Sequence, residues 1–149
     1  MILQGQFSVQ APREKVWEAI WDVRTLASWI PGCTSAERLG DRSYRVRLEQ
    51  QISMFKAAFD LRLEVVESEP PNRVVVKGQG EDRRMASNLQ IQTEVRLHSE
   101  SPESTTLHYR HDLSIFGRLG ALGFPLIQRK AREAEAEFAR RAREALAGG

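Results

Sequence analysis

The chain has 149 residues, of which 41% are hydrophobic and 28% are charged, as in ordinary soluble globular proteins. Its net charge of +2 is too small to indicate a nucleic-acid-binding protein. The single cysteine, Cys33, excludes an internal disulfide and a cysteine-based metal cluster, and it fits a cytoplasmic location. No signal peptide and no membrane-spanning run is visible. We therefore expect one domain over residues 1–149.

The first 32 residues predict one strand followed by two short helices. Near the N-terminus, apolar or small residues alternate with polar ones, as in a strand with one polar face: Leu3, Gly5, Phe7 and Val9. Pro12 suits the first turn of a helix. Asp22 can cap a second helix that ends at Trp29, and Pro31 cannot continue that helix.

The middle of the chain predicts consecutive strands with no helix between them. Turn signals such as Gly40-Asp41-Arg42 and Pro70-Pro71-Asn72 separate the strands. The predicted strands cover residues 34–39, 43–52, 55–65, 73–77, 85–97 and 107–115. Three of them have clear inward rows: Phe55, Ala57, Phe59, Leu61, Leu63 and Val65; then Met85, Ser87, Leu89, Ile91, Thr93, Val95 and Leu97; then Tyr109, His111, Leu113 and Ile115.

The last segment, residues 126–146, predicts a long helix because it is rich in good helix formers and contains no helix breaker. Its apolar and small residues share one face: Ile127, Ala131, Ala134, Phe138, Ala142 and Leu146. Because much of this stripe is alanine, the helix can either lie close to a sheet or leave a gap beside it. The interspersed arginines and the glutamates, Glu135 among them, predict an ordinary solvated face.

These elements together predict the fold class. Strands with one polar face and tight turns indicate an antiparallel sheet, and only the C-terminal helix is large enough to cover its apolar face. A twisted sheet of that many strands curls. We expect an α+β helix-grip fold, in which a curved antiparallel sheet of about six to seven strands wraps around the long C-terminal helix. Two short helices follow the first strand and close one end.

Several motifs carry a resemblance to a known family: Ala11-Pro12-Arg13-Glu14-Lys15-Val16-Trp17, Asp22, Ile30-Pro31-Gly32-Cys33, Gly78-Gln79-Gly80, Tyr109 with Asp112, and Phe116-Gly117-Arg118-Leu119-Gly120. The order of elements resembles the START-like, or Bet v 1-like (SRPBCC), superfamily over essentially the whole chain. The Ile-Pro-Gly-Cys motif is more specific and resembles the CoxG family of carbon monoxide dehydrogenase subunits.

The resemblance implies a binding module, not an enzyme, with no cofactor. Its implied partners are a hydrophobic small molecule (quinone or lipid), a molybdenum-containing dehydrogenase and, peripherally, the inner face of the membrane, but no nucleic acid. Members of the superfamily typically hold such ligands beneath the long helix. Some relatives carry a C-terminal extension for membrane attachment, whereas this chain stops at Gly149, so we do not expect direct anchoring.

The expected ligand site is a pocket between the sheet and the C-terminal helix. His111 is the strongest polar candidate, because alternation points it inward, where it could donate a hydrogen bond to a quinone oxygen. The alternative is a histidine bonded to Thr93, Ser87 or the backbone. Trp29 is expected beside the cavity entrance. The expected walls are Phe55, Phe59, Leu61, Leu89, Ile91, Leu113, Leu119, Leu122, Ile127 and Ala131.

No catalytic residue and no metal site is expected. Cys33 has no base nearby in sequence, which favours a small buried thiol, and the histidines share no face with acidic residues at ligand spacing. An enzyme needs polar groups that converge inside the pocket, and the inward rows offer His111, Tyr109 and Tyr44 but no carboxylate. Two alternatives stay open: an assembly or membrane-recruitment factor with a solid interior, and a cyclase- or hydrolase-type enzyme.

Overall fold

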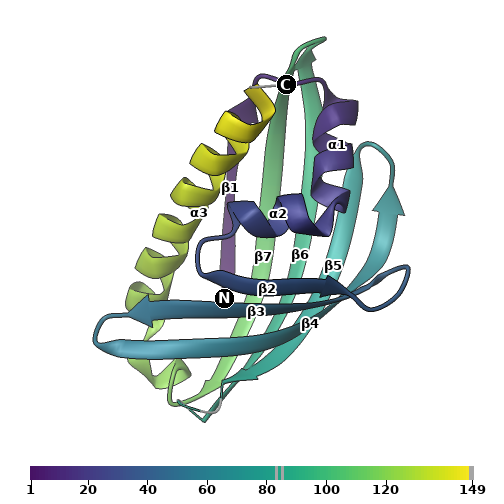
Figure 1. The fold of residues 1–149 in the computed structure, drawn as a ribbon. Helices are drawn as coiled ribbons and strands as arrows, with labels where there is room; N and C mark the ends of the chain where they lie inside the picture. The colour runs from purple at the N-terminus through teal and green to yellow at the C-terminus, as the bar shows by residue number, and fades with distance from the viewer. Residues whose placement is uncertain (83, 85, 148–149) are drawn as a thin grey trace.

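The computed structural model describes residues 1–82, 84 and 86–147, so Met85, which the sequence places in an inward row, lies outside the described residues. The predicted order of elements is confirmed (Figure 1). The elements are β1 (Ile2–Val9), α1 (Arg13–Trp21), α2 (Val23–Trp29), β2 (Cys33–Arg38), β3 (Ser43–Ile52), β4 (Phe55–Glu69), β5 (Arg73–Asp82), β6 (Ser87–Ser101), β7 (Ser104–Gly117), a 3₁₀ turn η1 (Gly120–Leu122) and α3 (Phe124–Ala147).

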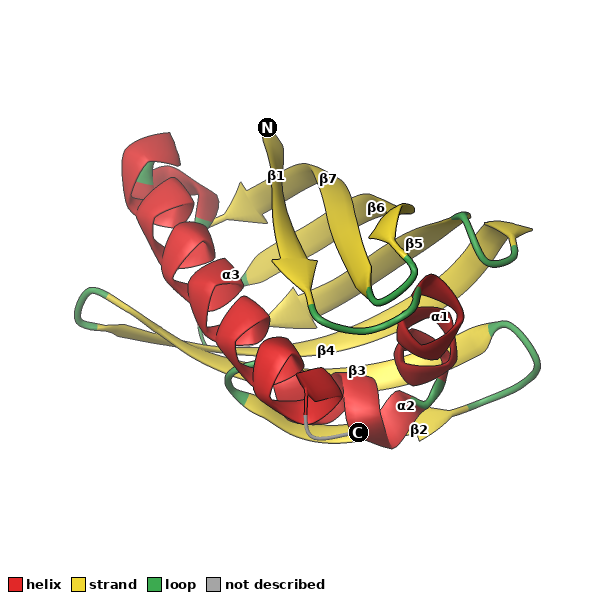
Figure 2. Ribbon diagram, turned by 90° about the horizontal axis from the view of Figure 1, so that it is seen from above, coloured by secondary structure: helices red, strands yellow, loops and turns green. Residues whose placement is uncertain are grey.

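The seven strands form one antiparallel sheet in the order β1-β7-β6-β5-β4-β3-β2. The sheet curls so that β2, β3 and β4 run across the direction of the other strands, and α3 lies inside the curve (Figures 1 and 2). A register shift between Val65 and Glu67 of β4 adds to the bend, because a bulge increases the local twist of a strand. The helix-grip prediction is therefore confirmed.

The Pro31-Gly32 turn joins α2 to the sheet. As the sequence predicts, the Asp22 carboxylate caps α2 by accepting hydrogen bonds from the backbone N–H groups of Arg24 and Thr25, at 3.1 and 3.2 Å. Gly32 has a φ of +82°, and a Cβ atom there would overlap the carbonyl oxygen of Glu49 in β3. Glycine is the residue that this close approach and this backbone conformation favour.

β5 extends to Asp82, whereas the sequence predicts a strand that ends at residue 77. The two glycines that resemble a turn signal stay in the ladder, where Gly78 pairs with Leu63 and Gly80 pairs with Leu61. A Cβ atom at either glycine would overlap the leucine side chain beside it. The glycines therefore make room for inward leucines of β4, which their composition alone does not reveal.

The hydrophobic core is divided into two clusters along α3. The first cluster lies around the start of α3 and contains Leu3, Ile52, Ala57, Phe59, Leu61, Leu89, Leu113, Leu119 and Ile127. The second cluster lies under α1, α2 and the end of α3 and contains Val9, Ala11, Val16, Trp29, Leu97, Leu107, Ala142 and Leu146. A single helix thus covers two separate apolar regions of the sheet.

Basic side chains attach α3 to its surroundings. Arg132 and Arg143 donate hydrogen bonds to the carbonyl oxygens of Gln4 and Ser8 in β1, at 2.9 and 3.0 Å. Because β1 is an edge strand, these arginines cover backbone groups that could otherwise pair with another chain. Lys15 of α1 donates to the carbonyl oxygen of Leu146 near the end of α3, at 3.3 Å. No helix within the described residues is long and apolar enough to cross a membrane.

We predict that Leu119→Ala lowers the free energy of unfolding by about 2–5 kcal/mol, because Leu119 is 0% exposed in the first cluster and its truncation leaves a cavity. The matched control is Leu39→Ala, at a leucine that is 52% exposed, for which a change within about 0.5 kcal/mol is expected. Urea denaturation followed by circular dichroism measures both. Equal losses in the two variants would contradict the assignment of Leu119 to the core.

Candidate functional site

Polar and small residues separate the two apolar clusters at one level of the fold. We call this set the polar belt: Gly5 of β1, Thr93 of β6, Tyr109 and His111 of β7, and Glu135 of α3. In the sheet, Gly5 pairs with Tyr109 and Thr93 pairs with His111. On α3, Glu135 lies four residues after Ala131, which packs on the first cluster, and three before Phe138, which packs on the second. The belt is therefore a polar layer inside an apolar grip.

Glu135 brings a carboxylate into this interior. Its side chain is 16% exposed, and its Oε2 accepts hydrogen bonds from the Tyr109 hydroxyl at 2.9 Å and from Arg132 Nη1 at 3.0 Å. Its Oε1 is buried and has no hydrogen-bond partner among the described residues. The prediction that no carboxylate points inward is therefore wrong, as is the assignment of Glu135 to a solvated face. The spacing from Ala131 and Phe138 is the signal that could have placed Glu135 on the inner face.

Gly5 is what allows Tyr109 to reach the helix. A Cβ atom at Gly5 would overlap the hydroxyl end of the Tyr109 ring, so the ring passes over β1 only where that strand has no side chain. Burial and, second, the hydrogen bond to Glu135 raise the pKa of the Tyr109 phenol to about 12. The phenol therefore stays protonated near neutral pH and acts as the donor in its bond to Glu135.

His111 is half-buried beside Tyr109, with 5.4 Å between the ring centroids. Its Nδ1 lies 2.8 Å from the hydroxyl of Thr93, the partner that one of the two sequence interpretations names. Burial lowers the pKa of His111, against a smaller opposing effect of the Glu135 charge, so the neutral imidazole is favoured near pH 7. When Thr93 donates to Nδ1, Nε2 carries the proton, and Nε2 has no partner among the described residues.

The predicted wall residues divide into three groups. Six are buried in the first cluster: Phe59, Leu61, Leu89, Leu113, Leu119 and Ile127. Three are half-buried against it, namely Ile91, Leu122 and Ala131, and these retain surface that a ligand could cover. Phe55 lies at the end of the β3–β4 turn and is 36% exposed. Trp29 is 2% exposed and packs on Phe138 in the second cluster, so it does not border an entrance as expected.

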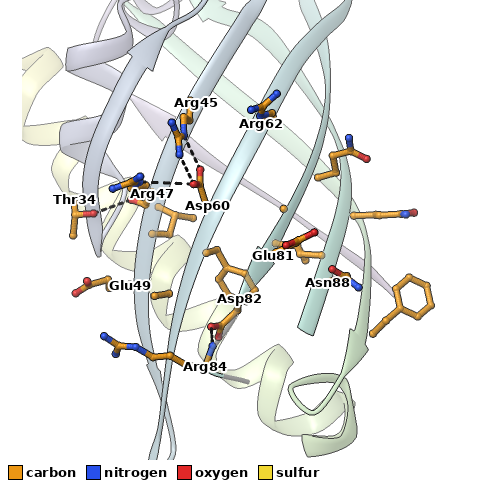
Figure 3. A pocket seen from close by; sticks show the side chains of 18 residues that line it. Thr34, Arg45, Arg47, Glu49, Asp60, Arg62, Glu81, Asp82, Arg84 and Asn88 are labelled. Atoms are coloured by element: carbon orange, nitrogen blue, oxygen red, sulfur yellow. Dashed lines mark hydrogen bonds and ion pairs between the residues drawn. The ribbon is translucent and has the colours of Figure 1, made fainter. Parts of the chain in front are cut away.

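A groove of about 1040 Å³ lies on the outer face of the sheet, over β3, β4, β5 and β6 (Figure 3). Charged side chains of both signs line it, with Arg45 bound to both carboxylate oxygens of Asp60 at 2.9 and 2.6 Å. The hydrogen bond from Arg45 is the main reason that the pKa of Asp60 is lowered. Because the charges on this surface pair with one another, the groove does not suit the apolar ligand that the sequence predicts.

Two other candidate chemistries find little support. Cys33 is half-buried, and burial raises the pKa of its thiol, which disfavours the thiolate that a nucleophile requires. Within residues 1–82, 84 and 86–147, no three His, Cys, Asp or Glu side chains are grouped closely enough to hold a metal ion. The polar belt is therefore the site at which chemistry or ligand recognition can be argued from geometry.

The sequence model of the CoxG family of carbon monoxide dehydrogenase subunits matches residues 5–147 of this chain. No curated protein matches this chain. A conserved protein from Geobacillus kaustophilus has a similar structure, with a TM-score of 0.91 at 23% identity over 99% of this chain and 96% of that one.

Two further solved structures are similar. A START superfamily protein from Mycobacterium smegmatis has a TM-score of 0.75 at 14% identity, over 99% of this chain and 97% of that one. The Zhui aromatase/cyclase from Streptomyces sp. R1128 has a TM-score of 0.72 at 16% identity, over 98% and 93%. At these identities, the similarities establish the START-like fold alone.

We predict that Gly5→Ala separates the Tyr109 hydroxyl from Glu135, because the new methyl group takes its place. Without that hydrogen bond and part of its burial, the Tyr109 pKa should fall from about 12 toward its ordinary value of 10.0. An ultraviolet pH titration in a Tyr44→Phe background follows this phenol alone. The control is Gly40→Ala, where a Cβ atom meets nothing within 4 Å. An unchanged titration of Gly5→Ala would contradict the close approach.

Stability should depend on the protonation of His111. Because burial holds its folded-state pKa below the ordinary value of 6.5, the unfolded chain binds a proton in this window that the folded chain does not. The free energy of unfolding should therefore fall as the pH drops from about 6.5 toward the folded pKa. Urea denaturation at about pH 7.5 and about pH 5.5 should show a smaller loss for His111→Gln than for the wild type. His98→Gln, at an exposed histidine, should behave as the wild type does.

Proposed function

Because this chain belongs to the CoxG family of carbon monoxide dehydrogenase subunits, we propose that it binds a hydrophobic small molecule, a quinone or a lipid, between the sheet and α3. In this proposal it serves as an accessory protein of a CO dehydrogenase-like molybdenum enzyme. The observation that carries the ligand proposal is the polar belt, which is half-buried between two apolar clusters. A largely apolar site with a few polar groups is the usual design of a small-molecule pocket.

The inner face of the sheet retains surface that an apolar ligand would cover. Leu63 and Ile91 belong to inward rows next to the first cluster, yet both are half-buried, as are Thr93 and His111. Removing such apolar surface from water contributes about 25 cal/mol per Å². The neutral His111 and the Tyr109–Glu135 pair would then orient the polar end of the ligand within the belt.

The partner enzyme is inferred from the family description, which names carbon monoxide dehydrogenase. A small domain that shields an apolar ligand from water would carry that ligand to or from such an enzyme. This role requires release as well as binding, so the ligand would be held mainly by apolar contact, with few polar bonds.

An enzyme is the second candidate, and one observation favours it. Tyr109, His111 and Glu135 converge in the interior, which supplies the polar groups that acid–base catalysis on an enclosed substrate requires. The Zhui protein shows that an aromatase/cyclase uses a similar fold. A catalyst would change the mass of the bound compound during incubation, whereas a carrier would release the same compound that it bound.

Mass spectrometry of an organic extract tests the proposal, together with thermal unfolding in the presence of 1,4-naphthoquinone or oleic acid. A ligand that binds the folded state alone at about 100 times its Kd stabilises it by about 2.7 kcal/mol. Ala131→Phe should fold and lose this stabilisation, because residue 131 is half-buried beside the first cluster and a phenyl ring would occupy the ligand's space. Ala136→Phe is the matched control, since Ala136 is exposed on the same helix.

A stoichiometric compound in the extract, together with stabilisation that Ala131→Phe abolishes and Ala136→Phe preserves, would support the proposal. A blank extract and no stabilisation by either probe would contradict it. The inward rows would then be solid core, and the assembly-factor alternative would take its place.

A further inference from the structure

We infer that the polar belt recognises a hydroxyl group, so that the ligand in the grip is a hydroxyl-bearing apolar molecule whose O–H donates a hydrogen bond to Glu135 Oε1. This inference rests on the proposed function, because it requires that a ligand enter the space between the sheet and α3. It adds the chemical class of the ligand's polar end, which neither the family nor the fold specifies.

The first argument is the unused oxygen of Glu135. The Oε2 atom accepts two hydrogen bonds, from Tyr109 and Arg132, while Oε1 is buried without a partner among the described residues. A buried acceptor without a donor is unfavourable, and hydrogen bonds to charged groups are the stronger ones. A carboxylate paired with an arginine only accepts hydrogen bonds, so a ligand group that meets Oε1 has to be a donor.

The second argument is that the carboxylate is held in place before any ligand arrives. The Tyr109 hydroxyl, which reaches Glu135 across Gly5, and the Arg132 guanidinium both hold Oε2. Arg132 is itself fixed by its bond to the carbonyl oxygen of Gln4 in β1. Because two donors from different elements fix one oxygen, the direction of the other is set by the fold, and a ligand need not order it on binding.

The third argument is the neighbouring imidazole. His111 has one nitrogen bound to Thr93 and leaves Nε2 without a partner among the described residues. With its proton on Nε2, the imidazole can donate to an oxygen lone pair of the ligand. A hydroxyl oxygen is both donor and acceptor, and therefore matches a site that presents an acceptor and a donor on adjacent elements. An ether or a carbonyl oxygen would meet His111 favourably but would place a lone pair against Glu135.

A consequence follows for a ligand that exists in two redox states. A reduced, dihydroxy form can donate to Glu135 Oε1, whereas the oxidised, dicarbonyl form cannot. The belt should therefore bind the reduced form more tightly than the oxidised form. A carrier with this preference would take up the product of a quinone-reducing enzyme more readily than its substrate.

The test compares 2-naphthol, 2-methoxynaphthalene and naphthalene by equilibrium dialysis against the full chain. The three probes share one ring system and differ in the donor hydrogen and the oxygen. We expect 2-naphthol to bind about tenfold or more tightly than 2-methoxynaphthalene, as for a hydrogen bond to a charged group. In Glu135→Gln, the amide oxygen should take the bond from Tyr109 and turn the NH₂ group to the ligand, which removes the preference. Glu133→Gln, at an exposed position of α3, should retain it.

The outcomes separate this inference from the proposed function. Equal binding of 2-naphthol and 2-methoxynaphthalene to the wild type would overturn the inference while leaving a ligand site in the grip. A preference that persists in Glu135→Gln would overturn the assignment to Glu135. If none of these probes binds, and 1,4-naphthoquinone and oleic acid also fail, both proposals are wrong. The wild-type comparison is decisive by itself if Glu135→Gln does not fold.

Discussion

The structure depends on one constraint: a strongly curled antiparallel sheet has a single apolar face, and α3 has to cover it. The inner side of α3 is rich in alanine, so its larger apolar side chains lie toward its two ends and small ones lie between them. The core consequently divides into a first cluster around Leu119 and a second cluster around Trp29. Arginines of α3 also cover the β1 edge, which an open sheet of this kind would otherwise expose.

The division of the core explains why polar chemistry is tolerated inside this fold. Between the clusters, Tyr109 and Glu135 satisfy each other across Gly5, and His111 is bonded to Thr93. Each group thus has at least one partner, which limits the free-energy cost of placing it in the interior. The atoms left over, Glu135 Oε1 and His111 Nε2, belong to the layer between the two apolar clusters, where the proposed ligand would bind. Stability and the proposed recognition therefore depend on the same residues.

Much of the fold can be predicted from local patterns. The two-residue alternation of β4, β6 and β7 places residues such as Leu61 and Leu113 on the inner face, as the structure has them. The same alternation points His111 inward, beside one of its expected partners. Glu135 escapes prediction, because a glutamate among other glutamates and arginines on a helix suggests a solvated face. The prediction for Trp29 is wrong because α2 turns its ring into the second cluster and not toward an entrance.

The sequence by itself determined the order of the elements, the antiparallel sheet and the membership of the inward rows, because these follow from periodicities of two and about 3.6 residues that act over a few neighbours. Only the tertiary structure decided how α3 is rotated on the sheet, which glycine lies under which ring, and which carboxylate oxygen is left without a donor among the described residues. Those features depend on contacts between residues far apart in the chain, such as Gly5, Tyr109 and Glu135. Close packing, which no local pattern specifies, sets their geometry.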